Sequence, residues 1–160
     1  MKILILGASY GSLLSTKLLM AGHDVTLICR SKSAALINDE GTEVRIKLRD
    51  EDSHRAFRSH DLAGTLDAVT PADARPEDYD MISLAMQEPQ YSEPQVCDLM
   101  QRIAASRKPC LSIMNMPPLP FLRRIDALAE APLDMCYDDA SVWADFEPGL
   151  MSLCSPDPQA

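Results

Sequence analysis

Residues 1–30 read MKILILGASYGSLLSTKLLMAGHDVTLICR and decide the fold. The apolar run at 3–6 ends at Gly7 and is typical of a central parallel strand that is covered on both faces. Leucines at helical spacing predict a helix over 12–21, which a glycine then stops. The apolar, β-branched run at 25–29 predicts a second strand. Strand, helix and strand in this order form a βαβ unit, whose right-handed crossover implies parallel pairing.

The alternation of strands and helices continues along the rest of the chain. We expect helices at 33–40, 96–105 and 119–129, strands at 42–48, 80–86, 110–114 and 133–137, and a further short strand at 151–154. The charged residues 49–58 are predicted to form a hairpin loop or an edge, residues 65–76 a connection, and Pro156 and Pro158 an extended tail. This order predicts an α/β, Rossmann-type doubly wound, mostly parallel sheet with helices on both faces, folded as a single domain over 1–160.

The composition limits the classes to which the protein can belong. Hydrophobic residues make up 46% and charged residues 24% of the chain, as in a globular domain. The net charge of -9 argues against nucleic acid and anionic membrane as partners. The 5 cysteines are dispersed and form no C-x-x-C pair, so neither a metal site nor a disulfide framework is predicted. No signal peptide or membrane segment is recognisable, so we expect a cytoplasmic location.

A glycine-containing turn directly follows the first strand and leads into the first helix. Its residues are Gly7, Ala8, Ser9, Tyr10 and Gly11. In this context backbone N–H groups and the positive helix N-terminus can bind a pyrophosphate. The turn departs from G-x-G-x-x-G, because the middle glycine is Ser9 and the last comes one residue early. A purely structural tight turn is the alternative.

The end of the second strand bears on which dinucleotide fits. An acidic residue there would bind the ribose 2′-hydroxyl of NAD, but this chain has Arg30, Ser31 and Lys32. Two cations and a hydroxyl match a 2′-phosphate by charge and hydrogen bonding, which favours NADP(H). A solvated basic loop is the alternative.

Three stretches resemble the ketopantoate reductases (2-dehydropantoate 2-reductases), and the likeness extends over nearly the whole chain. The first is residues 1–31, which contain the turn and the arginine just described. The second is Leu84-Ala85-Met86-Gln87, where Gln87 stands in place of a family lysine that contacts cofactor and substrate. The third is Ser112-Ile113-Met114-Asn115, which resembles a strand that ends in an asparagine near the nicotinamide ribose; Met116 replaces the glycine that usually follows.

The resemblance implies a cofactor, a substrate class and a second domain. It implies NADP(H), with Arg30 holding the 2′-phosphate and Met86 and Asn115 flanking the nicotinamide. Gln87 and Asn115 are the candidates on the side of the substrate, a 2-keto acid or related carbonyl compound. Family members carry a helical C-terminal domain that supplies the catalytic lysine and an acidic residue. We therefore expect no catalytic residue in this chain, which should bind cofactor without turnover.

A second hypothesis is a stand-alone NADP(H)-binding sensor or regulatory module that acts on a partner through its acidic C-terminal flank. The sequence also leaves open whether the chain forms a homodimer. Trp143, the single tryptophan, is expected either to pack against the absent domain or to anchor the last segment of this chain.

Overall fold

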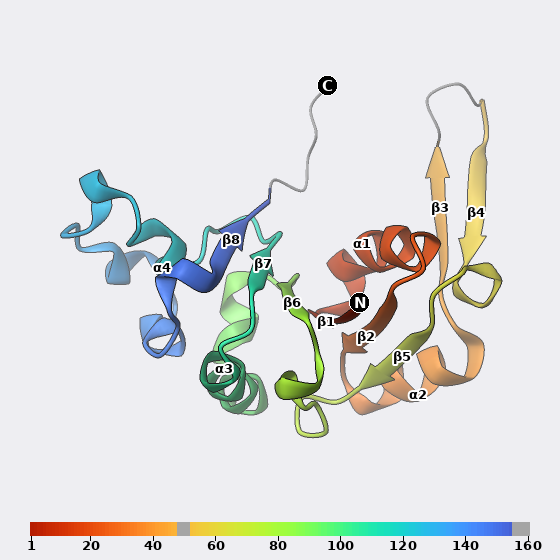
Figure 1. Cartoon of the computed structure of the whole chain (residues 1–160), viewed down its shortest axis with the longest axis horizontal. Coiled ribbons are helices and arrows are strands. Elements are labelled where there is room, and N and C mark those ends of the chain that lie inside the picture. The colour runs from red at the N-terminus through yellow and green to blue at the C-terminus, as the bar shows by residue number, and fades with distance from the viewer. Residues whose placement is uncertain (48–51, 155–160) are drawn as a thin grey trace.

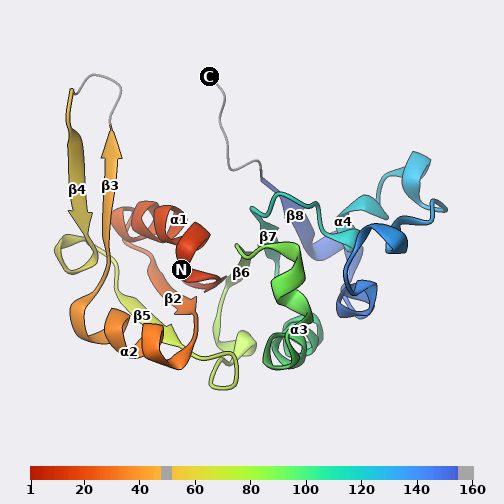
Figure 2. The same ribbon diagram turned by 180° about the vertical axis from the view of Figure 1, so that it is seen from behind.

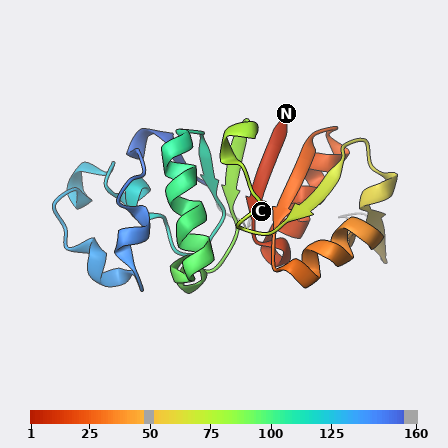
Figure 3. The ribbon, with the colours of Figure 1, turned by 90° about the horizontal axis from the view of Figure 1, so that it is seen from below.

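The computed structural model describes residues 1–47 and 52–154, and a parallel sheet forms its centre (Figure 1). The strands of this sheet are β1 (Lys2–Leu6), β2 (Asp24–Ile28), β5 (Leu66–Val69), β6 (Met81–Leu84), β7 (Cys110–Ser112) and β8 (Met151–Leu153). They lie in the order β5-β2-β1-β6-β7-β8, which Figure 3 shows from below, and every neighbouring pair is parallel. The chain starts in the middle and winds outward in both directions, so the predicted Rossmann-type fold is confirmed.

Two hydrophobic clusters cover the two faces of the sheet. The helices are α1 (Ala8–Met20), α2 (Ser31–Glu40), α3 (Pro94–Ser106) and the short α4 (Leu119–Leu122). Ile3 and Ile5 of β1 belong to the cluster that includes residues of α1 and α2. Leu4 and Leu6 belong to the cluster that includes residues of α3. Because successive side chains of a strand point to opposite faces, one apolar run supplies both layers of the core.

A separate hairpin follows α2 and projects beyond the main sheet (Figures 1 and 2). It consists of β3 (Glu43–Lys47) and β4 (His54–Arg58), which pair antiparallel. The Glu43 carboxylate joins the strands, since it accepts hydrogen bonds from the Nε atoms of Arg45 and Arg58 at 2.9 Å each. The predicted strand at 42–48 is present as β3, while residues 48–51 of the predicted strand and loop lie outside the described residues.

The prediction of a connection over 65–76 was wrong in its first part, because residues 66–69 form β5 at one edge of the sheet. Ala68 is the buried residue of this short strand. Among the residues that the structure describes, no strand pairs with the outer side of β5, and the Asn38 side-chain amide bonds there instead. Asn38 Nδ2 donates to the Ala68 carbonyl at 2.8 Å and Asn38 Oδ1 accepts from its N–H at 2.7 Å. A remote side chain thus completes the hydrogen bonding of a strand with little hydrophobic pattern.

The predicted helix at 119–129 starts as expected but is much shorter, and the predicted strand at 133–137 was wrong. The helix stops after α4, and residues 133–136 form a short 3-10 helix. The Arg123 guanidinium explains this path, because it donates to the carbonyls of Ala129 and Ala131 at 2.7 and 2.8 Å and pairs with Asp134 at 3.1 Å. The sixth position of the sheet belongs to β8, which confirms the short strand predicted near 151–154. The tail prolines lie outside the described residues.

Within residues 1–47 and 52–154, no helix is long and apolar enough to cross a membrane. The same residues contain no group of three or more histidine, cysteine, aspartate or glutamate side chains that could hold a metal ion.

Alkaline pH is expected to destabilise the fold through a buried thiol. Burial raises the pKa of Cys110 from its ordinary 9.0 to about 12. Between these values the unfolded chain releases the proton while the folded chain keeps it. Stability that is present below pH 9.0 is therefore lost as the pH rises toward 12. The expected loss from this group is about 1.4 kcal/mol for each pH unit.

Urea unfolding across this pH interval measures the slope. Cys110→Ala is the matched variant, because it removes the ionisable group and leaves the other alkaline titrations in place. Its stability should fall less steeply with pH than that of the wild type, whatever its stability at neutral pH. Equal slopes for the two proteins would contradict the prediction.

Candidate functional site

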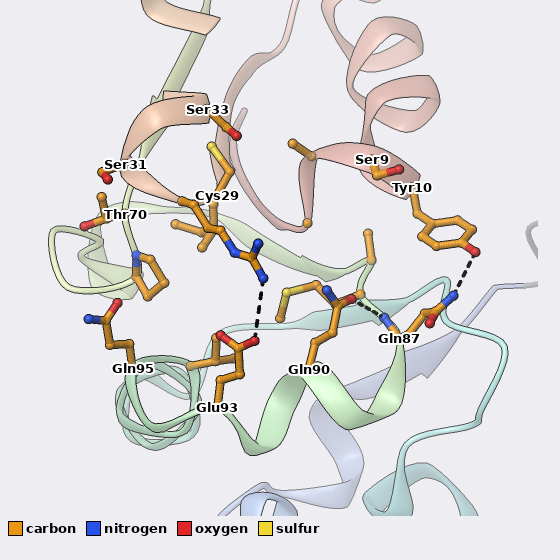
Figure 4. A pocket seen from close by; sticks show the side chains of 18 of the residues that line it. Ser9, Tyr10, Cys29, Ser31, Ser33, Thr70, Gln87, Gln90, Glu93 and Gln95 are labelled. Atoms are coloured by element: carbon orange, nitrogen blue, oxygen red, sulfur yellow. Dashed lines mark hydrogen bonds and ion pairs between the residues drawn. The ribbon is translucent and has the colours of Figure 1, made fainter. Parts of the chain in front are cut away.

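A pocket opens at the carboxyl ends of β1, β2, β5 and β6 (Figure 4). Its volume is about 810 Å³, within the range of small-molecule sites. The centre of a doubly wound sheet is also the place where such folds bind ligands, because the connections on either side of β1 run in opposite directions. The residues that line the pocket include Gly7, Ala8, Ser9, Tyr10, Cys29, Arg30, Ser31, Ser33, Thr70, Pro71, Met86, Gln87, Gln90, Glu93 and Gln95.

The turn after β1 depends on the backbone conformation of Gly7. Its φ of 104° is one that residues with side chains rarely adopt. A Cβ at this position would lie 2.7 Å from the Ala85 carbonyl oxygen and 2.7 Å from Met86 Cγ. The sharp turn starts α1 at Ala8, four residues before the predicted start. The helix N-terminus thus reaches the pocket without a side-chain cap, and its first N–H groups are available to an anion.

Gly11 has a different role from Gly7, because it is buried and does not line the pocket. A Cβ there would lie 2.7 Å from Ile5 Cγ2, so the glycine allows α1 to pack closely on β1. Ser9 and Tyr10 are exposed and line the pocket. The turn therefore uses one glycine for the bend and one for helix packing, with Ser9 between them.

The N-terminus of α2 reaches the other end of the same pocket. Arg30 precedes the helix, and neither it nor a neighbour caps the helix with a side chain. Arg30, Ser31 and Ser33 line the pocket, whereas Lys32 is exposed and lies outside the lining. The Arg30 side chain is 86% exposed and its Nη2 lies 3.8 Å from Glu93 Oε1.

The end of β6 forms the wall between the two helix N-termini. The Met86 N–H donates to the hydroxyl of Tyr91 at 3.2 Å, which orients the backbone of this wall. Gln87 Nε2 donates to the Tyr10 hydroxyl at 3.1 Å and so links the wall to the start of α1 (Figure 4). Asn115 follows β7, is exposed and does not line the pocket.

The structure thus brings together eight of the residues predicted to bind cofactor or substrate and leaves three apart. Gly7, Ala8, Ser9, Tyr10, Arg30, Ser31, Met86 and Gln87 line one pocket, while Gly11, Lys32 and Asn115 do not. Sequence reasoning missed Thr70 and Pro71, because the strand that ends at Val69 was not recognised. It also missed Glu93 and Gln95, although Pro94 between them is a recognisable helix start.

The charges of the pocket are few and concentrated in one ion pair. Arg30 and Glu93 are the only formally charged residues that line it in the described part of the chain. The attraction for anions comes mainly from the N-termini of α1 and α2, since each carries a partial positive charge. Burial raises the pKa of the Cys29 thiol in the lining, so this group stays protonated rather than serving as a ready nucleophile. The arrangement can bind an extended ligand with two anionic groups.

The parallel doubly wound sheet, with a glycine turn at the carboxyl end of its first strand, defines a Rossmann-type α/β domain. The model of the family described as ketopantoate reductase PanE/ApbA matches residues 3–115, and the chain belongs to that family. No protein of curated function matches the sequence.

Solved structures of similar fold include two from bacteria. A putative ketopantoate reductase from Ralstonia solanacearum MolK2 is 18% identical with a TM-score of 0.67, and the match covers 96% of this chain and 44% of that one. A probable 2-dehydropantoate 2-reductase from Bacillus subtilis is 25% identical with a TM-score of 0.50, and the match covers 82% of this chain and 38% of that one. This chain therefore spans less than half of the length of either structure.

Proposed function

We propose that the chain is the NADP(H)-binding domain of a ketopantoate-reductase-like oxidoreductase that reduces a 2-keto acid or related carbonyl compound. The observation that carries the proposal is the opening of two uncapped helix N-termini into one pocket, with Arg30 at the second. NADP(H) has two anionic groups, the pyrophosphate and the 2′-phosphate. Two helix N-termini suit both, whereas NAD(H) needs only one.

The residues present fit such a cofactor. The turn at Gly7 leaves room that a Cβ would fill, and the N–H groups of Ser9 and Tyr10 in the uncapped first turn of α1 would bind the pyrophosphate. Arg30 and Ser31 would bind the 2′-phosphate, with Lys32 adding positive charge from outside the pocket lining. Gly11 serves the same site indirectly by seating α1 on β1.

The other end of the cofactor would lie toward the end of β6. Met86 lines this part of the pocket and would contact the nicotinamide. Gln87, which also lines the pocket, and Asn115, which lies outside its lining, would be the residues on the substrate side. The bound cofactor supplies hydride transfer to a carbonyl carbon. We propose that a further domain supplies the proton donor and encloses the substrate, because hydride transfer needs a positioned acid and exclusion of water. The chain alone should bind NADP(H) without turnover.

We also place the protein in the cytoplasm. Cys29, Cys97, Cys110 and Cys136 are free thiols rather than disulfides, which fits a reducing compartment.

Arg30→Ala is expected to weaken NADPH selectively. Loss of one charge-assisted contact costs about 1.5–3 kcal/mol, which is roughly tenfold or more in affinity. NADH lacks the 2′-phosphate and should change little. Nicotinamide fluorescence titration of the 160-residue chain with each cofactor measures both affinities.

Lys17→Ala is the matched control, because Lys17 is a cation in the last turn of α1, away from the end that reaches the pocket. It should bind both cofactors as the wild type does. Weak binding of NADPH and NADH to the same extent, unaffected by Arg30→Ala, would contradict the assignment of the cofactor.

A further inference from the structure

A carboxylate faces the arginine that we assign to the 2′-phosphate. Glu93 Oε1 lies 3.8 Å from Arg30 Nη2, and both residues line the pocket. Figure 4 marks the ion pair with a dashed line that ends at Glu93. The two side chains come from opposite sides of the pocket, because Arg30 follows β2 and Glu93 precedes α3. The part of the pocket that we assign to the 2′-phosphate therefore already contains a negatively charged side chain.

The backbone of Glu93 is fixed while its side chain is turned to the pocket. The Glu93 carbonyl accepts hydrogen bonds from the N–H groups of Val96 and Cys97 at 2.8 Å each, which secures the first turn of α3. Its carboxylate does not cap the helix, although it occupies the N-cap position. The Glu93 side chain is 58% exposed, so it is able to rotate away from Arg30. The helix thus starts without a hydrogen bond from this carboxylate, which lines the pocket instead.

We propose that Glu93 is a specificity-determining residue that competes with the 2′-phosphate for Arg30 and so limits the preference for NADP(H) over NAD(H). The inference rests on the proposed function. Without a ligand, Glu93 pairs with the arginine. A bound 2′-phosphate has to displace the carboxylate and then lies near it, so like charges repel. A ribose 2′-hydroxyl carries no charge and can donate a hydrogen bond to the carboxylate, so NAD(H) does not meet this penalty.

The test measures NADPH and NADH affinities of the 160-residue chain with Glu93→Gln and Glu93→Ser. Both variants remove the charge, and serine also offers α3 a favourable N-cap. Each should bind NADPH about two- to fivefold more tightly, the size expected for an exposed charge interaction. NADH affinity should stay the same or fall, because its ribose 2′-hydroxyl meets no repulsion from the carboxylate and loses a charged hydrogen-bond acceptor. The gain in NADPH affinity should shrink at high salt, because screening weakens exposed charges.

Glu40→Gln is the control for net charge. Glu40 is the last residue of α2 and is exposed, so its removal changes the total charge equally at the far end of that helix. It should leave both affinities unchanged.

Different outcomes contradict the role of Glu93 and the assignment of the cofactor. If Arg30→Ala weakens NADPH selectively but both Glu93 variants leave NADPH binding unchanged or weaker, the cofactor assignment stands and the role of Glu93 is overturned. Equal tightening of NADPH and NADH also overturns it. If Arg30→Ala does not distinguish the two cofactors, the proposed function itself is wrong. A circular dichroism melt of each variant confirms that the compared proteins are folded.

Discussion

Trp143→Ala should lower the free energy of unfolding by about 3–5 kcal/mol, the cost of removing a large aromatic side chain from a core. Trp143 is 2% exposed, although it lies in the irregular segment between α4 and β8. Its ring centroid lies 5.4 Å from that of Tyr91, 6.4 Å from Tyr137 and 5.8 Å from Phe146. The loss would be a large part of the stability of an ordinary domain.

The same substitution should weaken ligand binding, because the aromatic cluster supports the pocket wall. Tyr91 contacts Trp143 on one side, and its hydroxyl accepts the hydrogen bond from the Met86 N–H. A cavity at Trp143 lets the Tyr91 ring move and releases this part of the wall. NADPH titration at a temperature where the variant is still folded tests the coupling.

Two variants serve as controls in urea unfolding. Trp143→Phe should lose less stability, because it keeps an aromatic ring and removes a buried indole N–H that has no hydrogen-bond partner in the described structure. Met135→Ala removes a side chain that is 85% exposed and should change stability by no more than about 0.5 kcal/mol. A loss below about 1 kcal/mol for Trp143→Ala would contradict its role as an anchor.

Gly7→Ala is expected to destabilise the fold by about 2–6 kcal/mol and to abolish tight binding of NADPH. A residue with a side chain in this backbone conformation costs about 1–3 kcal/mol. The added methyl group also meets the Ala85 carbonyl oxygen at 2.7 Å, and this backbone atom cannot move without distorting β6. Overpacking of this kind costs about 1–3 kcal/mol more. Any relief of the clash shifts the turn or the wall, and both line the pocket.

Gly22→Ala separates the effect of backbone strain from that of the steric clash. Gly22 also has a positive φ, 78°, but a Cβ there would meet nothing within 4 Å. This variant should show the backbone strain alone and bind NADPH as the wild type does. Urea unfolding and nicotinamide fluorescence measure both proteins. If Gly7→Ala were no more destabilising than Gly22→Ala and bound NADPH normally, close packing of the turn against β6 would not matter.

The sequence predicted the central βαβ unit well because the signals are contiguous. Apolar runs mark β1 and β2, and Gly7 and Gly22 mark the turns on either side of α1. The start of α1 was placed four residues late, since no side-chain cap marks Ala8. The bend at Gly7, which starts the helix, is a property of the folded backbone rather than of a local pattern.

The residues of the candidate site also fall into two groups, those close in sequence to β1 or β2 and those from distant elements. Gly7, Tyr10 and Arg30 come shortly after the ends of the recognisable strands β1 and β2, so their place at the carboxyl edge of the sheet could be predicted. Glu93 and Thr70 reach the pocket from elements that are distant in sequence. Their positions depend on how α3 and β5 dock on the sheet, which short-range patterns do not encode.

By itself the sequence determined the fold class, the turn at Gly7 and the arginine at the end of β2, because each is encoded by neighbouring residues. Only the tertiary structure decided that residues 66–69 and 151–153 form the two edges of the sheet, and that Trp143 anchors the last segment inside this chain. Short edge strands carry little hydrophobic pattern, and their backbone groups are satisfied by remote partners such as the Asn38 side chain beside β5. The physical reason is that these partners meet only once the sheet has assembled.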